Sequence, residues 1–138
     1  MKNILKISTL VLATMLFASV TNVQGQVISI SVTDQHSPGP YGNGNTKYVA
    51  QWIIQDVNTL AYYSCTPNTC YWYYPNNSPN TEFTANLNAS STYVLKVQVS
   101  RYDFGGATPV TSGTGQSSNF LGSNFPYILF SIPVTLPQ

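Results

Sequence analysis

The only two cysteines of the chain, Cys65 and Cys70, are separated by four residues. A redox pair of the Cys-x-x-Cys type has two intervening residues, and a zinc site would need two further ligands, whereas the single histidine, His36, is distant in sequence. In an oxidising compartment, two cysteines at this spacing are expected to pair. The sequence therefore predicts a structural disulfide between Cys65 and Cys70 and no bound metal.

Residues for acid–base catalysis are scarce. After residue 25 the chain has three aspartates, one glutamate and one histidine. General acid–base catalysis needs two carboxylates, or a carboxylate and a histidine, in one cleft. Asp34 and His36 are two residues apart after a predicted strand, where an Asx-type turn explains the aspartate, and no serine lies in a Gly-x-Ser-x-Gly elbow. We therefore expect no enzymatic activity and no cofactor.

The segments on either side of the cysteine loop are dense in aromatic residues. Residues 60–65 and 70–75 read as the two arms of a hairpin, because Thr66-Pro67-Asn68-Thr69 fits a type I turn between them. With Cys65 opposite Cys70, alternation divides the arms into two faces. Ala61, Tyr63, Trp72 and Tyr74 share the face of the disulfide, and Tyr62, Tyr71 and Tyr73 share the other face.

The second of these faces is the candidate binding site. If Trp72 is buried, then Tyr62, Tyr71 and Tyr73 form an exposed row. Each tyrosine offers a flat apolar ring and a hydroxyl at low cost in conformational entropy, which suits both glycans and protein surfaces. The alternative is that these tyrosines are structural, since tyrosine has high β-propensity and pairs well across strands.

The first 25 residues have the pattern of a secretory signal peptide. Lys2 and Lys6 precede an apolar run over residues 7–20, and Val23 and Gly25 suit the −3 and −1 positions of a cleavage site. The apolar run is shorter than the roughly 18 residues of a membrane-spanning helix. We therefore expect residues 1–25 to be removed and residues 26–138 to form one secreted domain, periplasmic or extracellular, without a transmembrane segment.

Charge is low throughout the predicted mature chain. Three basic residues, Lys47, Lys96 and Arg101, stand against four acidic ones, which gives a net charge of −1. This is too little positive charge for nucleic acids or anionic membranes. The 43% of hydrophobic residues in the chain is ample for a folded core. Because charged residues are few, the surface must consist mostly of Ser, Thr, Asn, Gln and Tyr.

Hydrophobic residues alternate with polar ones in nearly every apolar stretch, which predicts an all-β domain. The expected strands cover residues 28–33, 47–55, 82–87, 92–102 and 127–136, in addition to the hairpin. Pro133 lacks an N–H group, so the last strand should lie at a sheet edge or carry a bulge. Residues 105–124 are rich in Gly, Ser and Thr and are expected to wrap an edge, with at most a short strand near 109–111.

Six or seven strands of this length favour an antiparallel two-sheet β-sandwich, with a barrel as the alternative. Residues 87–93, Leu-Asn-Ala-Ser-Ser-Thr-Tyr, followed by Val-Leu-Lys-Val-Gln-Val, resemble the E-to-F corner of fibronectin type III and related immunoglobulin-like domains. The resemblance implies that Leu87 ends strand E and that Tyr93 opens strand F, with its hydroxyl bonded to the corner backbone. The chain departs from that family in its predicted hairpin disulfide and in the length of chain after strand F.

Together these features predict a secreted, non-catalytic structural or adhesive module that acts through a low-charge surface rich in Tyr, Asn and Thr. Its partners would be other protein surfaces, glycans or further copies of itself. The alternative is a carbohydrate-binding domain that uses Tyr62, Tyr71 and Tyr73. A pore former is disfavoured, because the predicted hairpin arms are shorter than the 9 to 11 residues of a membrane-spanning strand.

Overall fold

A computed structural model describes residues 25–35 and 45–138 of the chain. Apart from Gly25, the predicted signal peptide lies outside the described residues, as does His36. The first strand begins at Gln26, the residue after the predicted cleavage site. Within the described residues, no helix has the length and hydrophobicity needed to cross a membrane.

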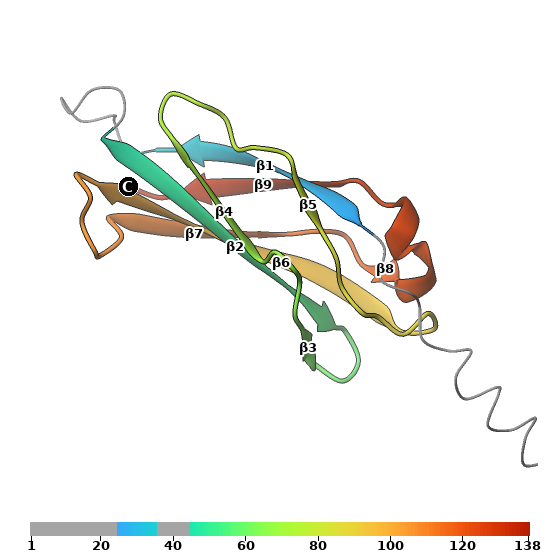
Figure 1. Ribbon diagram of the computed structural model, residues 1–138. Coiled ribbons are helices and arrows are strands. Elements are labelled where there is room, and N and C mark those ends of the chain that lie inside the picture. Colours follow the sequence, from blue (N-terminus) through green and yellow to red (C-terminus); the bar gives the residue numbers. More distant parts are fainter. Residues whose placement is uncertain (1–24, 36–44) are drawn as a thin grey trace, which may run out of the picture.

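The described chain forms two β-sheets, which confirms the prediction of an all-β, two-sheet fold (Figure 1). The smaller sheet has the strand order β5-β1-β9, and the larger has β2 and β6 at its centre. Both β3 and β4 pair with one edge of β2, and both β7 and β8 pair with the far edge of β6. The elements are β1 (Gln26–Asp34), β2 (Thr46–Asp56), β3 (Tyr62–Tyr63), β4 (Thr69–Tyr73), β5 (Thr81–Phe83), β6 (Thr92–Asp103), β7 (Thr111–Gln116), β8 (Phe120–Leu121), the 3-10 helix η1 (Gly122–Tyr127) and β9 (Phe130–Leu136).

Alternating side chains of the long strands fill the space between the two sheets. Trp52 of β2 and Val97 of β6 are buried from the larger sheet, as predicted from their positions in the alternation. Phe130 is buried from the smaller sheet, where it packs against Phe83 with ring centroids 5.9 Å apart. The strand interiors thus form one continuous hydrophobic core.

The turn that leads into β6 contains the corner expected from Leu87 and Tyr93. Both residues are fully buried, and the backbone N–H of Asn88 donates a hydrogen bond of 2.9 Å to the Tyr93 hydroxyl. The strand before the corner is shorter than predicted, since β5 ends at Phe83. Ala85 and Leu87 nevertheless point into the core.

Residues 105–124, predicted to be mostly loop, contain the strand β7, and this is a correction. β7 pairs antiparallel with β6 from Arg101–Thr111 to Lys96–Gln116. A Cβ atom on Gly115 would clash with the carbonyl oxygen of Pro133 in β9, and one on Gly113 would clash with that of Thr135. The glycines that suggested a loop are therefore the residues that let β9 approach β7 closely.

The last strand also departs from the predicted antiparallel arrangement. β9 runs parallel to β1, with Ile28 opposite Phe130 and Val32 opposite Val134. It is the edge strand of its sheet, as Pro133 predicted, and the Pro133 side chain points outward. The C-terminal strand therefore completes the smaller sheet beside the first strand of the domain.

Candidate binding face on the six-stranded sheet

The predicted hairpin between residues 60 and 75 does not form. Its two arms, β3 and β4, pair one after the other with the same edge of β2, β3 opposite Ile54–Gln55 and β4 opposite Lys47–Gln51 (Figure 1). Between them residues 64–67 leave the sheet, and Thr66 forms two backbone hydrogen bonds of 2.9 Å with Thr84. The long edge of β2 offers backbone N–H and C=O groups to both β3 and β4, so each of these strands pairs with β2 and they do not pair with each other.

The predicted disulfide between Cys65 and Cys70 is absent as well. Cys65 is buried in residues 64–67, which lie outside the sheet, whereas Cys70 lies in β4 opposite Ala50, so the two are not cross-strand neighbours. Burial raises the pKa of the Cys65 thiol to about 12, and it also raises the pKa of Cys70. Both thiols are therefore protonated near neutral pH and are poor nucleophiles.

Tyr62, Tyr71 and Tyr73 all lie on the outer face of the six-stranded sheet. Their side chains are 61%, 61% and 40% exposed, whereas Trp72 is buried and stacks on Tyr48 with ring centroids 5.4 Å apart. Within β4 the predicted division of faces holds although the hairpin was wrong, because side chains alternate with period two whichever strand is the partner. Tyr62, in β3, lies on the same outer face through its own pairing with Gln55. Tyr74 and Ala61, which were predicted to point inward, are exposed.

The three tyrosines do not form one continuous row. Tyr71 and Tyr73 meet edge to face with ring centroids 6.1 Å apart, and the Lys47 Nζ atom lies 4.6 Å from the centroid of the Tyr71 ring. Tyr62 lies opposite Gln55 of β2, six residues beyond the partner of Tyr71, which corresponds to about 20 Å along the strand. The outer face therefore has two separate aromatic positions.

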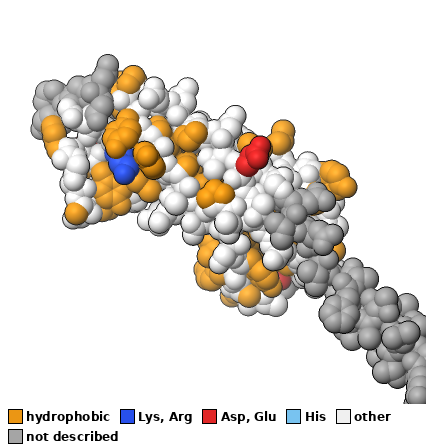
Figure 2. Space-filling model, in the orientation of Figure 1, with side chains coloured by type: hydrophobic (Ala, Val, Ile, Leu, Met, Phe, Trp, Pro, Cys, Tyr) orange, Lys and Arg blue, Asp and Glu red, His pale blue; other side chains and the backbone are white. Residues whose placement is uncertain are grey.

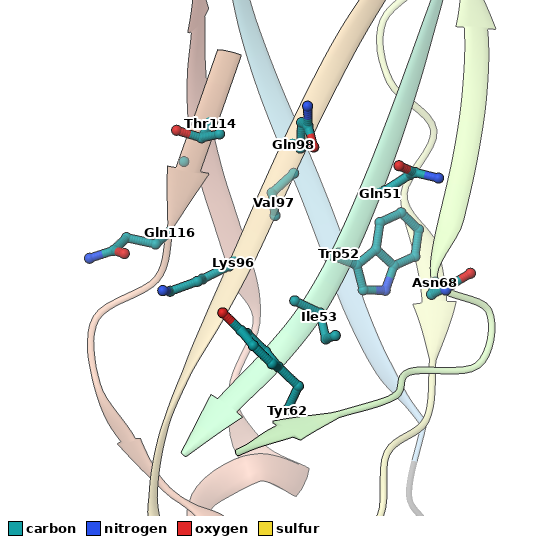
Figure 3. Close-up of a pocket in the computed structure, with 11 residues that line it drawn as sticks. Gln51, Trp52, Ile53, Tyr62, Asn68, Lys96, Val97, Gln98, Thr114 and Gln116 are labelled. Carbon is teal, nitrogen blue, oxygen red and sulfur yellow. The ribbon is translucent and has the colours of Figure 1, made fainter. Parts of the chain in front are cut away.

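A groove of about 760 Å³ crosses the outer face next to Tyr62 (Figure 3). Lys96, Gln116 and Tyr62 gather at one end of the groove in this view. Register places Gln51 opposite Gln98 and Gln98 opposite Thr114, so an uncharged polar row runs across three strands. Sequence reasoning missed this groove because it treated the residues of β7 as a loop.

A second hollow, of about 560 Å³, lies beside Tyr73 on the same face. Lys47 and Tyr102 line it, and Gly105 and Gly106 of the turn after β6 contribute its rim. Lys47 is the direct cross-strand neighbour of both Tyr73 and Tyr102, which explains why a basic side chain is surrounded by aromatic ones here. Figure 2 shows a basic side chain among hydrophobic ones near the end of the molecule where β2 begins.

Two of the four acidic residues of the chain are used inside the fold to hold Arg101. The Arg101 guanidinium is buried and forms ion pairs of 2.7 Å with Asp34 and 3.0 Å with Asp103. Burial alone would lower the pKa of Arg101, but these two carboxylates raise it. Tyr48 donates a hydrogen bond of 2.8 Å to Asp34, so this cluster links β1, β2 and β6. Asp34 thus ties the smaller sheet to the larger one through Arg101 and Tyr48. Neither Asp34 nor Asp103 lies beside the groove.

The other two acidic residues also lie away from the outer face. Asp56 accepts hydrogen bonds from the backbone N–H groups of Thr59 and Asn58, and these bonds lower its pKa. Glu82 lies in β5 of the smaller sheet. Among the described residues, the charged side chains on the outer face of the larger sheet are thus two lysines, Lys47 and Lys96.

The chain was compared with protein-family models, with curated proteins and with solved structures. None of them matches it. In residues 25–35 and 45–138, no group of three His, Cys, Asp or Glu side chains is placed to hold a metal ion. The polar groups that line the groove and the hollow are tyrosine rings, amides, hydroxyls and two ammonium groups.

Proposed function

We propose that this chain is an exported, non-catalytic adhesive module that binds its partner through the outer face of the six-stranded sheet. The observation that carries the proposal is the groove beside Tyr62, whose lining side chains Gln51, Gln98, Thr114 and Gln116 are exposed. A face that only supported the core would need neither a hollow nor an exposed pair of tyrosines at its other end.

The immunoglobulin-like character of the sandwich is part of this proposal. It is supported by the corner of Leu87 and Tyr93, with its hydrogen bond from Asn88. Export is supported by the pattern of residues 1–25 and by the start of β1 at Gln26. Secreted sandwich domains commonly present binding surfaces on a rigid scaffold, and the absence of paired carboxylates at the groove supports a role without catalysis.

Carbohydrate recognition is the second candidate, and one observation favours it. The polar row of Gln51, Gln98 and Thr114 lies next to the exposed ring of Tyr62. Amides both donate and accept hydrogen bonds, as sugar hydroxyls do, while an aromatic ring can cover an apolar sugar face. Self-association through the same face would use the tyrosines without requiring the polar row.

Thermal melting distinguishes these two forms of the proposal. A glycan that binds the folded protein raises the melting temperature in proportion to the logarithm of glycan concentration, at constant protein concentration. Self-association instead makes the melting temperature depend on the concentration of the protein itself. If neither a panel of glycans nor a hundredfold range of protein concentration changed the melting temperature, the proposed adhesive function would be contradicted.

A further inference from the structure

The outer face of the larger sheet has one lysine and at least one exposed tyrosine near each end. Lys47 lies over the ring of Tyr71 with its Nζ atom 4.6 Å from the centroid. Lys96 and Tyr62 line the same groove at the other end (Figure 3). Lys96 lies opposite Ile53, six residues along β2 from Lys47, so the two ammonium groups belong to positions about 20 Å apart.

The surface between these two pairs is uncharged. Its centre is the row that runs from Thr69 through Gln51 and Gln98 to Thr114, with one residue contributed by each of four strands. All four acidic residues lie elsewhere: two are bound to Arg101, one is the buried last residue of β2, and one is on the smaller sheet. The face is therefore positive at both ends and polar but neutral in the middle.

We propose that the ligand of this face is an acidic polysaccharide, a glycan chain bearing carboxylate or sulfate groups, that lies along β2 and β6. This inference rests on the proposed function and names its ligand class. The tyrosine rings cover apolar sugar faces, the amide and hydroxyl row bonds the sugar hydroxyls, and Lys47 and Lys96 pair with anionic groups of sugars near the two ends.

The wide spacing of the two lysines favours a polysaccharide with sparse charges over a densely charged polyanion such as DNA. Double-stranded DNA carries one negative charge per about 1.7 Å, and two lysines about 20 Å apart neutralise very little of it. Anchoring of a protein partner commonly uses a buried aromatic or Arg residue in a desolvated pocket. The centre of this face is instead a row of exposed polar side chains, which favours a chain of hydroxyl-bearing units with intermittent charge.

Isothermal titration of the mature protein with matched polymers tests the inference. The probes are polygalacturonate with its fully methyl-esterified form, dextran sulfate with dextran, and polyglutamate as a polyanion without sugars. The two acidic polysaccharides distinguish carboxylate from sulfate as the anionic group. We expect at least one of them to bind more tightly than its uncharged counterpart and than polyglutamate, and to lose affinity between 0.1 and 1 M salt as the Debye length falls from about 10 Å to about 3 Å.

Variants locate the binding to the two lysines. Lys47→Gln and Lys96→Gln should each weaken binding of the acidic polysaccharide about fivefold, and the double variant about twenty-fivefold. Lys47→Arg and Lys96→Arg should retain most of the affinity. Ser29→Asp, on the outer face of the smaller sheet, changes the net charge by the same amount as a Lys→Gln substitution and should leave the affinity unchanged.

Several results would overturn the inference. Equal binding of charged and uncharged polysaccharides would remove the role of the lysines but keep the adhesive function. Equally tight binding of polyglutamate would show that the sugar is not recognised. A loss of affinity in Ser29→Asp as large as in the lysine variants, or no binding of any probe by the wild-type protein, would also contradict it; the proposed function would then depend on the melting experiments.

Discussion

Tyr93 is fully buried at the entry to β6, and its hydroxyl holds the backbone of the preceding corner. Its hydroxyl accepts the hydrogen bond from the backbone of Asn88, and its ring lies 5.3 Å from that of Tyr63 between centroids. Tyr93→Phe keeps the ring but leaves the Asn88 N–H without its acceptor. We expect this substitution to lower the free energy of unfolding by about 1 to 2 kcal/mol, measured by urea denaturation.

Tyr62→Phe is the matched control, because it removes the same hydroxyl from an exposed side chain. Its effect should stay within about 0.5 kcal/mol. If Tyr93→Phe were equally neutral, the corner would owe its geometry to packing of Leu87 and the ring alone, and the hydrogen bond would have no measurable role.

The two cysteines give a second prediction at the scale of single residues. Because Cys65 is buried with a pKa of about 12, and Cys70 is only half-buried, an alkylating agent at pH 8 should modify Cys70 first in the folded protein. Both thiols should react once the protein is unfolded. Intact mass measured without a reductant reports the number of modified thiols, and unfolded protein that takes up no reagent would show that the two cysteines are joined.

At the scale of elements, β7 depends on two glycines facing β9. Gly115→Ala would place a methyl group against the carbonyl oxygen of Pro133 and the side chain of Ile132, so one of the two strands would have to move. We expect a loss of about 1 to 3 kcal/mol in the free energy of unfolding. Thr114→Ala, on the outer face of the same strand, is the control and should have a small effect; equal stability of the two variants would mean that β7 and β9 are not closely packed.

The strands that the sequence predicted well are those with strict alternation, although β9 begins at Phe130 and not at Tyr127, which ends the 3-10 helix η1. In β2, β6 and β9, large apolar residues recur at every second position, and this pattern specifies both the strand and its inward face. The same alternation explains why the sequence correctly predicted Tyr71 and Tyr73 on one face of β4 and Trp72 on the other. Side chains alternate between the two faces of a strand whichever strand it pairs with.

Pairing partners could not be predicted in the same way. A turn-like sequence at Thr66-Pro67-Asn68-Thr69 indicated a hairpin, but backbone groups pair with whichever edge is available, and β2 is long enough to accept both β3 and β4. The parallel pairing of β9 with β1 is another long-range choice with no local signal. The groove was missed for this reason, since Gln98 becomes the neighbour of Thr114 only through the pairing of β6 with β7.

At the scale of the whole molecule, the two sheets have different outer surfaces. The smaller sheet presents short hydroxyl side chains such as Ser29, Ser31 and Ser131, together with Glu82. The larger sheet presents the tyrosines, the amides and both lysines. Because of this asymmetry, we propose adhesion for the outer face of the larger sheet.

The most direct test of this assignment is the double substitution Tyr71→Ser and Tyr73→Ser, measured by thermal melting beside a glycan array and analytical sedimentation. Because both side chains are exposed, the free energy of unfolding should change by less than about 1 kcal/mol while glycan binding or self-association is lost. Tyr127→Ser, at an exposed tyrosine of η1, is the control and should keep both stability and binding. A loss of several kcal/mol would show that the tyrosines are structural, and a stable double variant with unchanged binding and assembly would contradict the assignment of this face.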